Sequence, residues 1–127
     1  MKPGSVFVAW GAFLAALAMA LGAIGSHLLQ GRLSPTMMDI YHIANQFQIY
    51  HALGLILVGI LIQIRQGRHL AILRWAGWIM LLGIFLFCGG LTVLTLTGWM
   101  WMAIFAPFGG TAFIAAWILV GVGALRG

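Results

Sequence analysis

Long stretches of apolar residues without a single charge alternate with short polar segments along this chain. Residues 6–24 contain no charged side chain, and a second charge-free stretch lies between Asp39 and Arg65. A helix needs roughly 20 apolar residues to cross a hydrocarbon core about 30 Å thick. The first stretch therefore predicts a transmembrane helix over residues 6–26. The high apolar density in the later part of the second stretch predicts another over residues 47–64.

The charge-free stretch between Arg74 and Arg126 is too long for one crossing. As a single helix its 51 residues would extend about 76 Å at about 1.5 Å per residue, so it must fold back on itself. The turn is best placed at residues 97–99, where Thr and Gly interrupt the apolar pattern and Trp suits the headgroup region. This hairpin predicts a third span over residues 75–96 and a fourth over residues 101–125.

These spans predict an all-α integral membrane protein, a single domain over residues 1–127 built as an up-down bundle of four transmembrane helices. Four crossings place both chain ends and the middle loop on one side of the membrane. That side carries five of the six basic residues, and the other carries only Arg32. Because positive residues gather on the cytoplasmic side, we expect a bacterial inner-membrane protein with cytoplasmic N- and C-termini. The five basic residues are Lys2, Arg65, Arg68, Arg74 and Arg126.

The first apolar stretch also has features of a secretory signal peptide. Lys2 gives it a positive start, and residues 18–20 are rich in small side chains. Its apolar region is longer than the roughly 7 to 15 residues of such peptides, so we expect an uncleaved span.

Composition agrees with a membrane protein whose first partner is the lipid bilayer. Hydrophobic residues make up 64% of the chain and charged residues 6%, against about 25% charged in soluble domains. The net charge of +5 would suggest a polyanionic partner in a soluble protein. Here the basic residues occur singly between apolar stretches, so nucleic-acid binding is not expected.

Small residues at helical spacing predict where helices approach one another closely. In the first span they recur at intervals of four, three and four, which places them on one face. In the fourth span, Pro107 removes a backbone donor and predicts a kink, and Gly109 beside it favours close packing. The first-span residues are Gly11, Ala15, Ala18 and Gly22.

The segment before the second span is the most polar part of the chain. Ser34 followed by Pro35 predicts a helix start, because Ser caps free amides and Pro suits the first helical position. We expect an amphipathic helix at the periplasmic surface that continues into the second span. Its predicted apolar face comprises Ile40, Ile43, Phe47, Tyr50 and Gly54.

Histidine placement raises the question of a cofactor. His27 ends the first predicted span and His51 lies near the start of the second, so we expect the two side chains at equal depth in the membrane. Two histidines on facing helices of a bundle can ligate a b-type haem, or a divalent metal with a further ligand. An interfacial hydrogen-bonded cluster without cofactor or metal is the favoured interpretation. This periplasmic-edge cluster comprises His27, Asp39, His42, Gln48, Tyr50 and His51.

Several classes of activity lack their usual residues. The predicted spans contain no Asp, Glu, Lys or Arg, whereas proton-coupled transporters carry such groups along their path. The chain holds one acidic side chain, and no nucleophile is paired with a base. We therefore expect a non-catalytic accessory or scaffold subunit that packs with a larger membrane complex or with itself. A histidine-based redox module and an oligomeric channel or carrier for a neutral solute are the alternatives.

Seven short segments of the chain form a recognisable set: residues 22–27, 33–35, 47–53, 76–78, 87–91, 96–98 and 106–110. They resemble the bacterial membrane family catalogued as domain of unknown function number 423, a relative of eukaryotic transmembrane protein 256. The resemblance implies a four-span inner-membrane protein without an established activity. Cys88 and Thr92 stand where the family is expected to have a serine and an aromatic residue, and Ser26 where it has alanine. The family's marked positions correspond to His27, Gln48, Tyr50, His51, Pro107 and Gly109.

Overall fold

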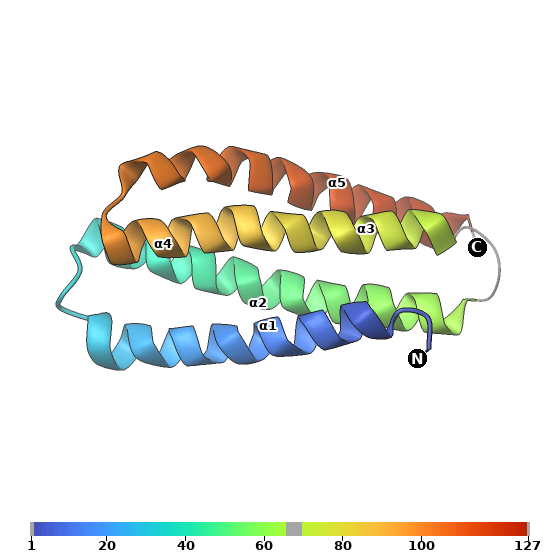
Figure 1. Cartoon of the computed structure of the whole chain (residues 1–127), viewed down its shortest axis with the longest axis horizontal. Coiled ribbons are helices and arrows are strands. Elements are labelled where there is room, and N and C mark those ends of the chain that lie inside the picture. The colour runs from blue at the N-terminus through green and yellow to red at the C-terminus, as the bar shows by residue number, and fades with distance from the viewer. Residues whose placement is uncertain (1, 66–69, 127) are drawn as a thin grey trace.

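The computed structural model describes residues 2–65 and 70–126, and all regular structure in them is helical. Four helices are long and apolar enough to cross a membrane (Figure 1). This agrees with the predicted number of spans. The helices are Ser5–Leu29, Pro35–Ile64, Leu70–Thr97 and Met100–Leu125.

Three of the four long helices change their hydrogen-bonding pattern along their length. The first consists of α1 (Ser5–Ile24) and a π-helical end, η1 (Gly25–Leu29). The second is the uninterrupted α2 (Pro35–Ile64). The third contains α3 (Leu70–Gly83), the π-helical η2 (Ile84–Gly89) and α4 (Gly90–Thr97). The fourth begins as the 3₁₀-helix η3 (Met100–Ile104) and continues as α5 (Phe105–Leu125).

The predicted helix start at Ser34 and the predicted turn before Trp99 are both confirmed. The Ser34 side chain accepts a hydrogen bond from the Met37 amide at 3.2 Å, and Pro35 is the first helical residue. Gly98 ends α4 with a φ of 77°, a left-handed conformation that glycine adopts without strain. The polar segment and the second span form one continuous helix, with no break near Phe47.

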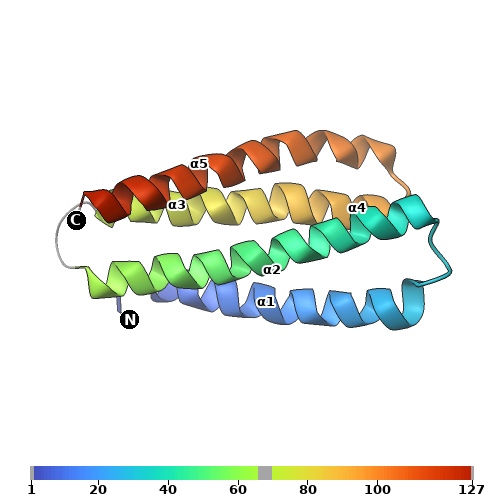
Figure 2. The same ribbon diagram turned by 180° about the vertical axis from the view of Figure 1, so that it is seen from behind.

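The helices form two antiparallel pairs, α1 with α2 and α3–η2 with α5 (Figure 2). Glycines at the contacts allow the two helices of each pair to approach closely. An added Cβ on Gly11 would lie 2.5 Å from the Ala52 carbonyl oxygen, and one on Gly109 would lie 2.5 Å from the Phe87 amide nitrogen. Such distances leave no room for a side chain, so backbone packs directly against backbone.

Gly11 and Ala18 are fully buried on the α1 face that meets α2, whereas Ala15 and Gly22 are half-buried on it. Pro107 lies on the surface in the first turn of α5. The departure from α-helical geometry lies in η3, at the start of the fourth long helix, so Pro107 does not kink the middle of that helix.

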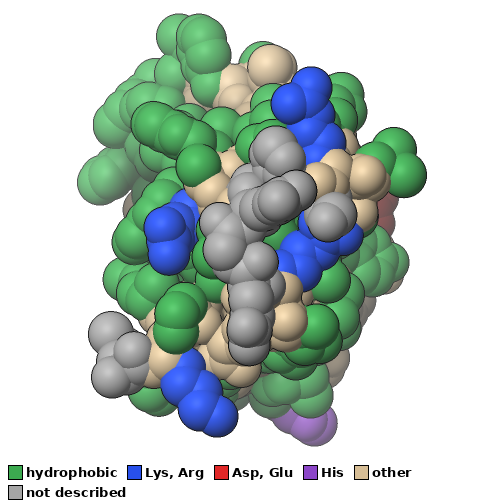
Figure 3. Space-filling view, turned by 90° about the vertical axis from the view of Figure 1, so that its right-hand side faces the viewer, with side chains coloured by type: hydrophobic (Ala, Val, Ile, Leu, Met, Phe, Trp, Pro, Cys, Tyr) green, Lys and Arg blue, Asp and Glu red, His purple; other side chains and the backbone are tan. Residues whose placement is uncertain are grey.

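Both chain ends lie at the same end of the bundle (Figure 1), and basic side chains gather there (Figure 3). Arg65 ends α2 and donates hydrogen bonds to the carbonyl oxygens of Gly123, at 2.6 Å, and Ala124. These carbonyls belong to the last turn of α5, where a helix has unpaired acceptors and negative dipole charge. Arg65 thus ties the ends of α2 and α5 together. Arg68, which also contributed to the predicted charge bias, lies outside the described residues.

Candidate functional site

A row of three polar side chains on α2 points at α1. The Tyr41 hydroxyl donates to the Leu21 carbonyl oxygen. One turn further along, the Asn45 amide nitrogen donates to the Ala18 carbonyl oxygen at 3.2 Å. The next member is Gln48, whose amide nitrogen donates to the Leu14 carbonyl oxygen at 2.9 Å. Spacings of four and three residues place all three on one helix face.

This polar row holds α1 in a fixed register against α2. In lipid, polar side chains find partners inside the bundle, and each interhelical hydrogen bond contributes about 0.6 kcal/mol on average. Glycines make the approach possible, because an added Cβ on Gly25 would lie 2.5 Å from the Tyr41 ring and one on Gly22 would lie 3.2 Å from the Asn45 amide nitrogen.

Two amide oxygens in the row are left over. Asn45 Oδ1 is buried and has no hydrogen-bond partner among the residues that the structure describes. Gln48 is only 4% exposed, and its Oε1 accepts no hydrogen bond from any described residue. A buried polar atom without a partner, such as Asn45 Oδ1, is uncommon in proteins, since it forgoes the bonds that it would make with water.

Gln48 also lies against a groove between α1 and the third long helix. The groove has a volume of about 150 Å³ and is mainly apolar. Leu17 and Leu21 form its α1 side, and Phe85 and Val93 contribute the facing wall. Thr92 is the other polar residue in the lining. The arrangement combines an apolar surface with two uncharged hydrogen-bonding side chains.

His51 points towards α5 and not towards α1. Its ring stacks on Phe113 with a centroid separation of 3.5 Å and an interplanar angle of 11°, and only 6% of the residue is exposed. Nδ1 lies 2.7 Å from the Phe47 carbonyl oxygen. Since a carbonyl can only accept, Nδ1 carries the proton of this bond, and in the neutral ring Nε2 holds the lone pair.

The equal depth expected for His27 and His51 is not found. Gly11 packs against Ala52, the next residue after His51, and therefore lies at the same depth in the bundle as His51. His27, by contrast, lies exposed in η1. Sixteen residues separate His27 from Gly11, which corresponds to about 24 Å along a helix. The cause is that α2 begins at Pro35, so His51 lies about halfway along it. One copy of the chain therefore does not present these two side chains to one haem.

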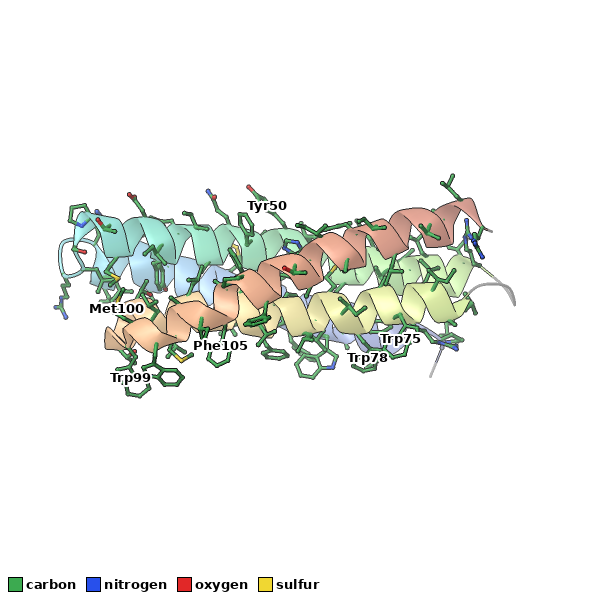
Figure 4. All side chains as sticks on the ribbon, turned by 90° about the horizontal axis from the view of Figure 1, so that it is seen from above. Tyr50, Trp75, Trp78, Trp99, Met100 and Phe105 are labelled. Carbon is green, nitrogen blue, oxygen red and sulfur yellow. The ribbon has the colours of Figure 1, made fainter. Side chains whose placement is uncertain are left out.

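The other members of the expected cluster are also dispersed. Asp39 and His42 are exposed and line a shallow hollow beneath the connection between the first two helices. Tyr50 is 56% exposed and points away from the bundle (Figure 4). Within residues 2–65 and 70–126, no three His, Cys, Asp or Glu side chains come close enough to hold a metal ion.

Sequence reasoning did not select Tyr41 and Asn45 as site residues. The available signal was the spacing of Tyr41, Asn45 and Gln48, which repeats like one face of a helix within an otherwise apolar segment. The arrangement can hold two helices together and can offer uncharged hydrogen-bonding groups to a ligand. The described groove brings together no nucleophile and base.

Comparison with known proteins places the chain among membrane proteins. A family model described as "Protein of unknown function (DUF423)" matches residues 21–110. The UPF0382 membrane protein YwdK of Bacillus subtilis (strain 168) is 39% identical over 121 residues, which are 95% of this chain and 97% of the relative. The UPF0382 membrane protein SH2409 of Staphylococcus haemolyticus is 36% identical over 115 residues, 91% of each chain.

No solved structure matches the chain. The family model covers well over half of the residues, and the relatives align over nearly their full lengths. The chain therefore belongs to the membrane-protein family of unknown function DUF423, as the resemblance of its segments predicted.

Proposed function

We propose that this protein is a non-catalytic subunit of the inner membrane that acts by packing against copies of itself or against a larger membrane complex. The supporting observation is a second row of small residues on α1, on the side that no other helix covers. All five members are exposed, and they recur at intervals of three or four residues. They are Ala9, Ala12, Ala16, Ala20 and Ala23.

Such an exposed alanine row suits a helix of another subunit. Lipid tails solvate leucine as well as a neighbouring helix does, so helix association in membranes depends on close backbone approach over small residues. The row of Gly11 and Ala18 serves this purpose within the chain, against α2. The described connections between the long helices, residues 30–34 and 98–99, are short. Helix surfaces therefore make up most of what the protein offers to a partner.

The proposal predicts that Ala16→Leu disrupts assembly without unfolding the chain. The larger side chain would hold a partner helix away from α1, and we expect at least a tenfold loss of co-purifying protein. The measurement is extraction from native membranes into polymer-bounded nanodiscs, followed by native mass spectrometry and pull-down between two differently tagged copies. Gly121→Leu is the matched control, because Gly121 is exposed on α5 with nothing within 4 Å.

Two results would contradict this assignment. One is a wild-type chain that is monomeric and brings down no membrane protein. The other is an Ala16→Leu variant that keeps the same associated species as the Gly121→Leu control.

For orientation, we propose an up-down bundle whose chain ends face the cytoplasm, with the start of α2 at the periplasmic surface. The basic side chains at the end shared by both chain ends support it, because positive residues gather on the cytoplasmic side. In a Cys88→Ala background, a membrane-impermeant maleimide should label Gln30→Cys in intact spheroplasts and Ala124→Cys only after permeabilisation. Both positions are exposed. The reverse labelling pattern would overturn the orientation.

A further inference from the structure

The groove beside Gln48 lies near the middle of the membrane-crossing helices. Leu14 and Gln48, which are joined by a hydrogen bond, each lie about halfway along their helices, Ser5–Leu29 and Pro35–Ile64. The groove lining contains no charged residue. A ligand at this depth must itself be uncharged, because a charge near the bilayer centre is strongly disfavoured.

Both polar side chains of the groove retain hydrogen-bonding capacity. Gln48 is only 4% exposed, and its Oε1 accepts no hydrogen bond from the described residues. Threonines in membrane helices usually donate to a backbone carbonyl, as Thr95 and Thr97 do at 2.8 and 2.6 Å. Thr92 makes no such bond to a described residue and lies in the groove lining.

The geometry points to a binding site for a neutral lipid that carries a hydroxyl group, and we propose this as the occupant of the groove. A hydroxyl can donate to Gln48 Oε1 while its oxygen accepts from Thr92. The apolar remainder would lie against Leu17, Leu21 and Phe85. A volume of about 150 Å³ is that of a cavity known to hold one benzene ring, so a phenolic ring or a short prenyl segment fits. This binding goes beyond the packing role and does not depend on it.

The test compares an alcohol with its own methyl ether. A photoreactive farnesol analogue and the methyl ether of the same analogue are added to the chain in phospholipid nanodiscs, and labelling is quantified by mass spectrometry. We expect the alcohol to reach half-maximal labelling at about one tenth of the ether concentration, as the one hydrogen bond that the ether cannot donate to Gln48 would give. Labels should map to the groove-lining parts of α1 and α4.

Variants separate the hydrogen bonds from the apolar surface. Gln48→Leu should reduce the preference for alcohol over ether towards equality, because only the alcohol can donate to Oε1. Thr92→Val should weaken labelling by both probes alike, because an ether oxygen also accepts from the threonine hydroxyl. Leu17→Trp should block the groove and lower labelling by both probes at least fivefold. Phe13→Trp is its control, because Phe13 lies one turn away on α1, is 73% exposed and does not line this groove.

Competition identifies which hydroxyl lipid binds best. Displacement of the probe by farnesol supports an isoprenoid alcohol, and stronger displacement by a short-chain quinol supports a phenolic headgroup. Equal labelling of wild-type protein by alcohol and ether would overturn the proposal. So would undiminished labelling by both probes in Thr92→Val, a change that leaves the α1–α2 hydrogen bonds in place.

Discussion

Replacement of Gly109 by alanine is expected to lower the free energy of unfolding by about 3 kcal/mol, whereas the same change at the adjacent Gly110 should leave it unchanged or slightly raised. A Cβ on Gly109 would meet the Phe87 amide nitrogen at 2.5 Å and its Cα at 2.9 Å. These are backbone atoms, so the strain is relieved only by moving α5 away from η2. A Cβ on Gly110 meets nothing within 4 Å and gains the higher helix propensity of alanine.

The measurement is reversible unfolding of both variants in mixed micelles, followed by circular dichroism and tryptophan fluorescence. The pair of variants shares chemistry, helix and depth, and differs only in what the added methyl group meets. Equal stability of the two would show that α5 does not pack against η2 at the observed distance.

A second large effect is expected for Gly11→Val, about 3–5 kcal/mol of lost stability. The new Cβ would lie 2.5 Å from the Ala52 carbonyl oxygen and 2.7 Å from Ile56 Cγ1. α1 packs mainly against α2, so a shift of α1 would also lengthen the interhelical hydrogen bonds of Gln48 and its two companions in the row.

The control for Gly11→Val is Gly121→Val, whose added side chain would enter open space. Readouts are the unfolding midpoint and the rate of maleimide labelling at Ala15→Cys, which is half-buried at the α1–α2 contact. We expect Gly11→Val to lower the midpoint and speed labelling, and Gly121→Val to do neither. Unchanged labelling in Gly11→Val would contradict the α1–α2 register described above.

The four long helices and their turns could be predicted because lengths and charges constrain them strongly. A charge-free stretch of 51 residues has to fold back, and Gly98 supplies the conformation at that turn. The cap at Ser34 follows equally from local chemistry, since its hydroxyl satisfies a free amide and Pro35 needs no partner.

The buried face of α2 could not be predicted from hydrophobic periodicity. Ile43 and Tyr50 belong to the predicted apolar face and are exposed, while Tyr41 and Gln48 point inward. In water, apolar residues turn inward because the solvent is polar. In lipid that preference disappears, and the groups that need partners turn inward instead. The same rule explains why His51 is buried against Phe113 and not at the bilayer edge.

The expected convergence of polar residues failed for a related reason. It assumed that the membrane-crossing part of the second helix starts near Phe47, where apolar density rises, but α2 packs in the bundle as one continuous helix from Pro35. Twelve further helical residues move His51 down the bundle by about 18 Å. Composition shows which segments are apolar enough to lie in lipid, whereas the depth of each residue in the membrane depends on where the helix begins.

The π-helical segment η2 affects how relatives of this chain should be aligned. A π-turn accommodates one residue more than an α-turn, so everything after it is rotated by about 100° relative to an uninterrupted α-helix. Leu94 and Thr95 of α4 are buried with this rotation in place. A homologue that is α-helical throughout would need a one-residue gap between Ile84 and Gly89 to keep equivalent positions on the same face. An insertion or deletion at that point therefore changes which side chains of α4 face the bundle, in addition to the length of the helix.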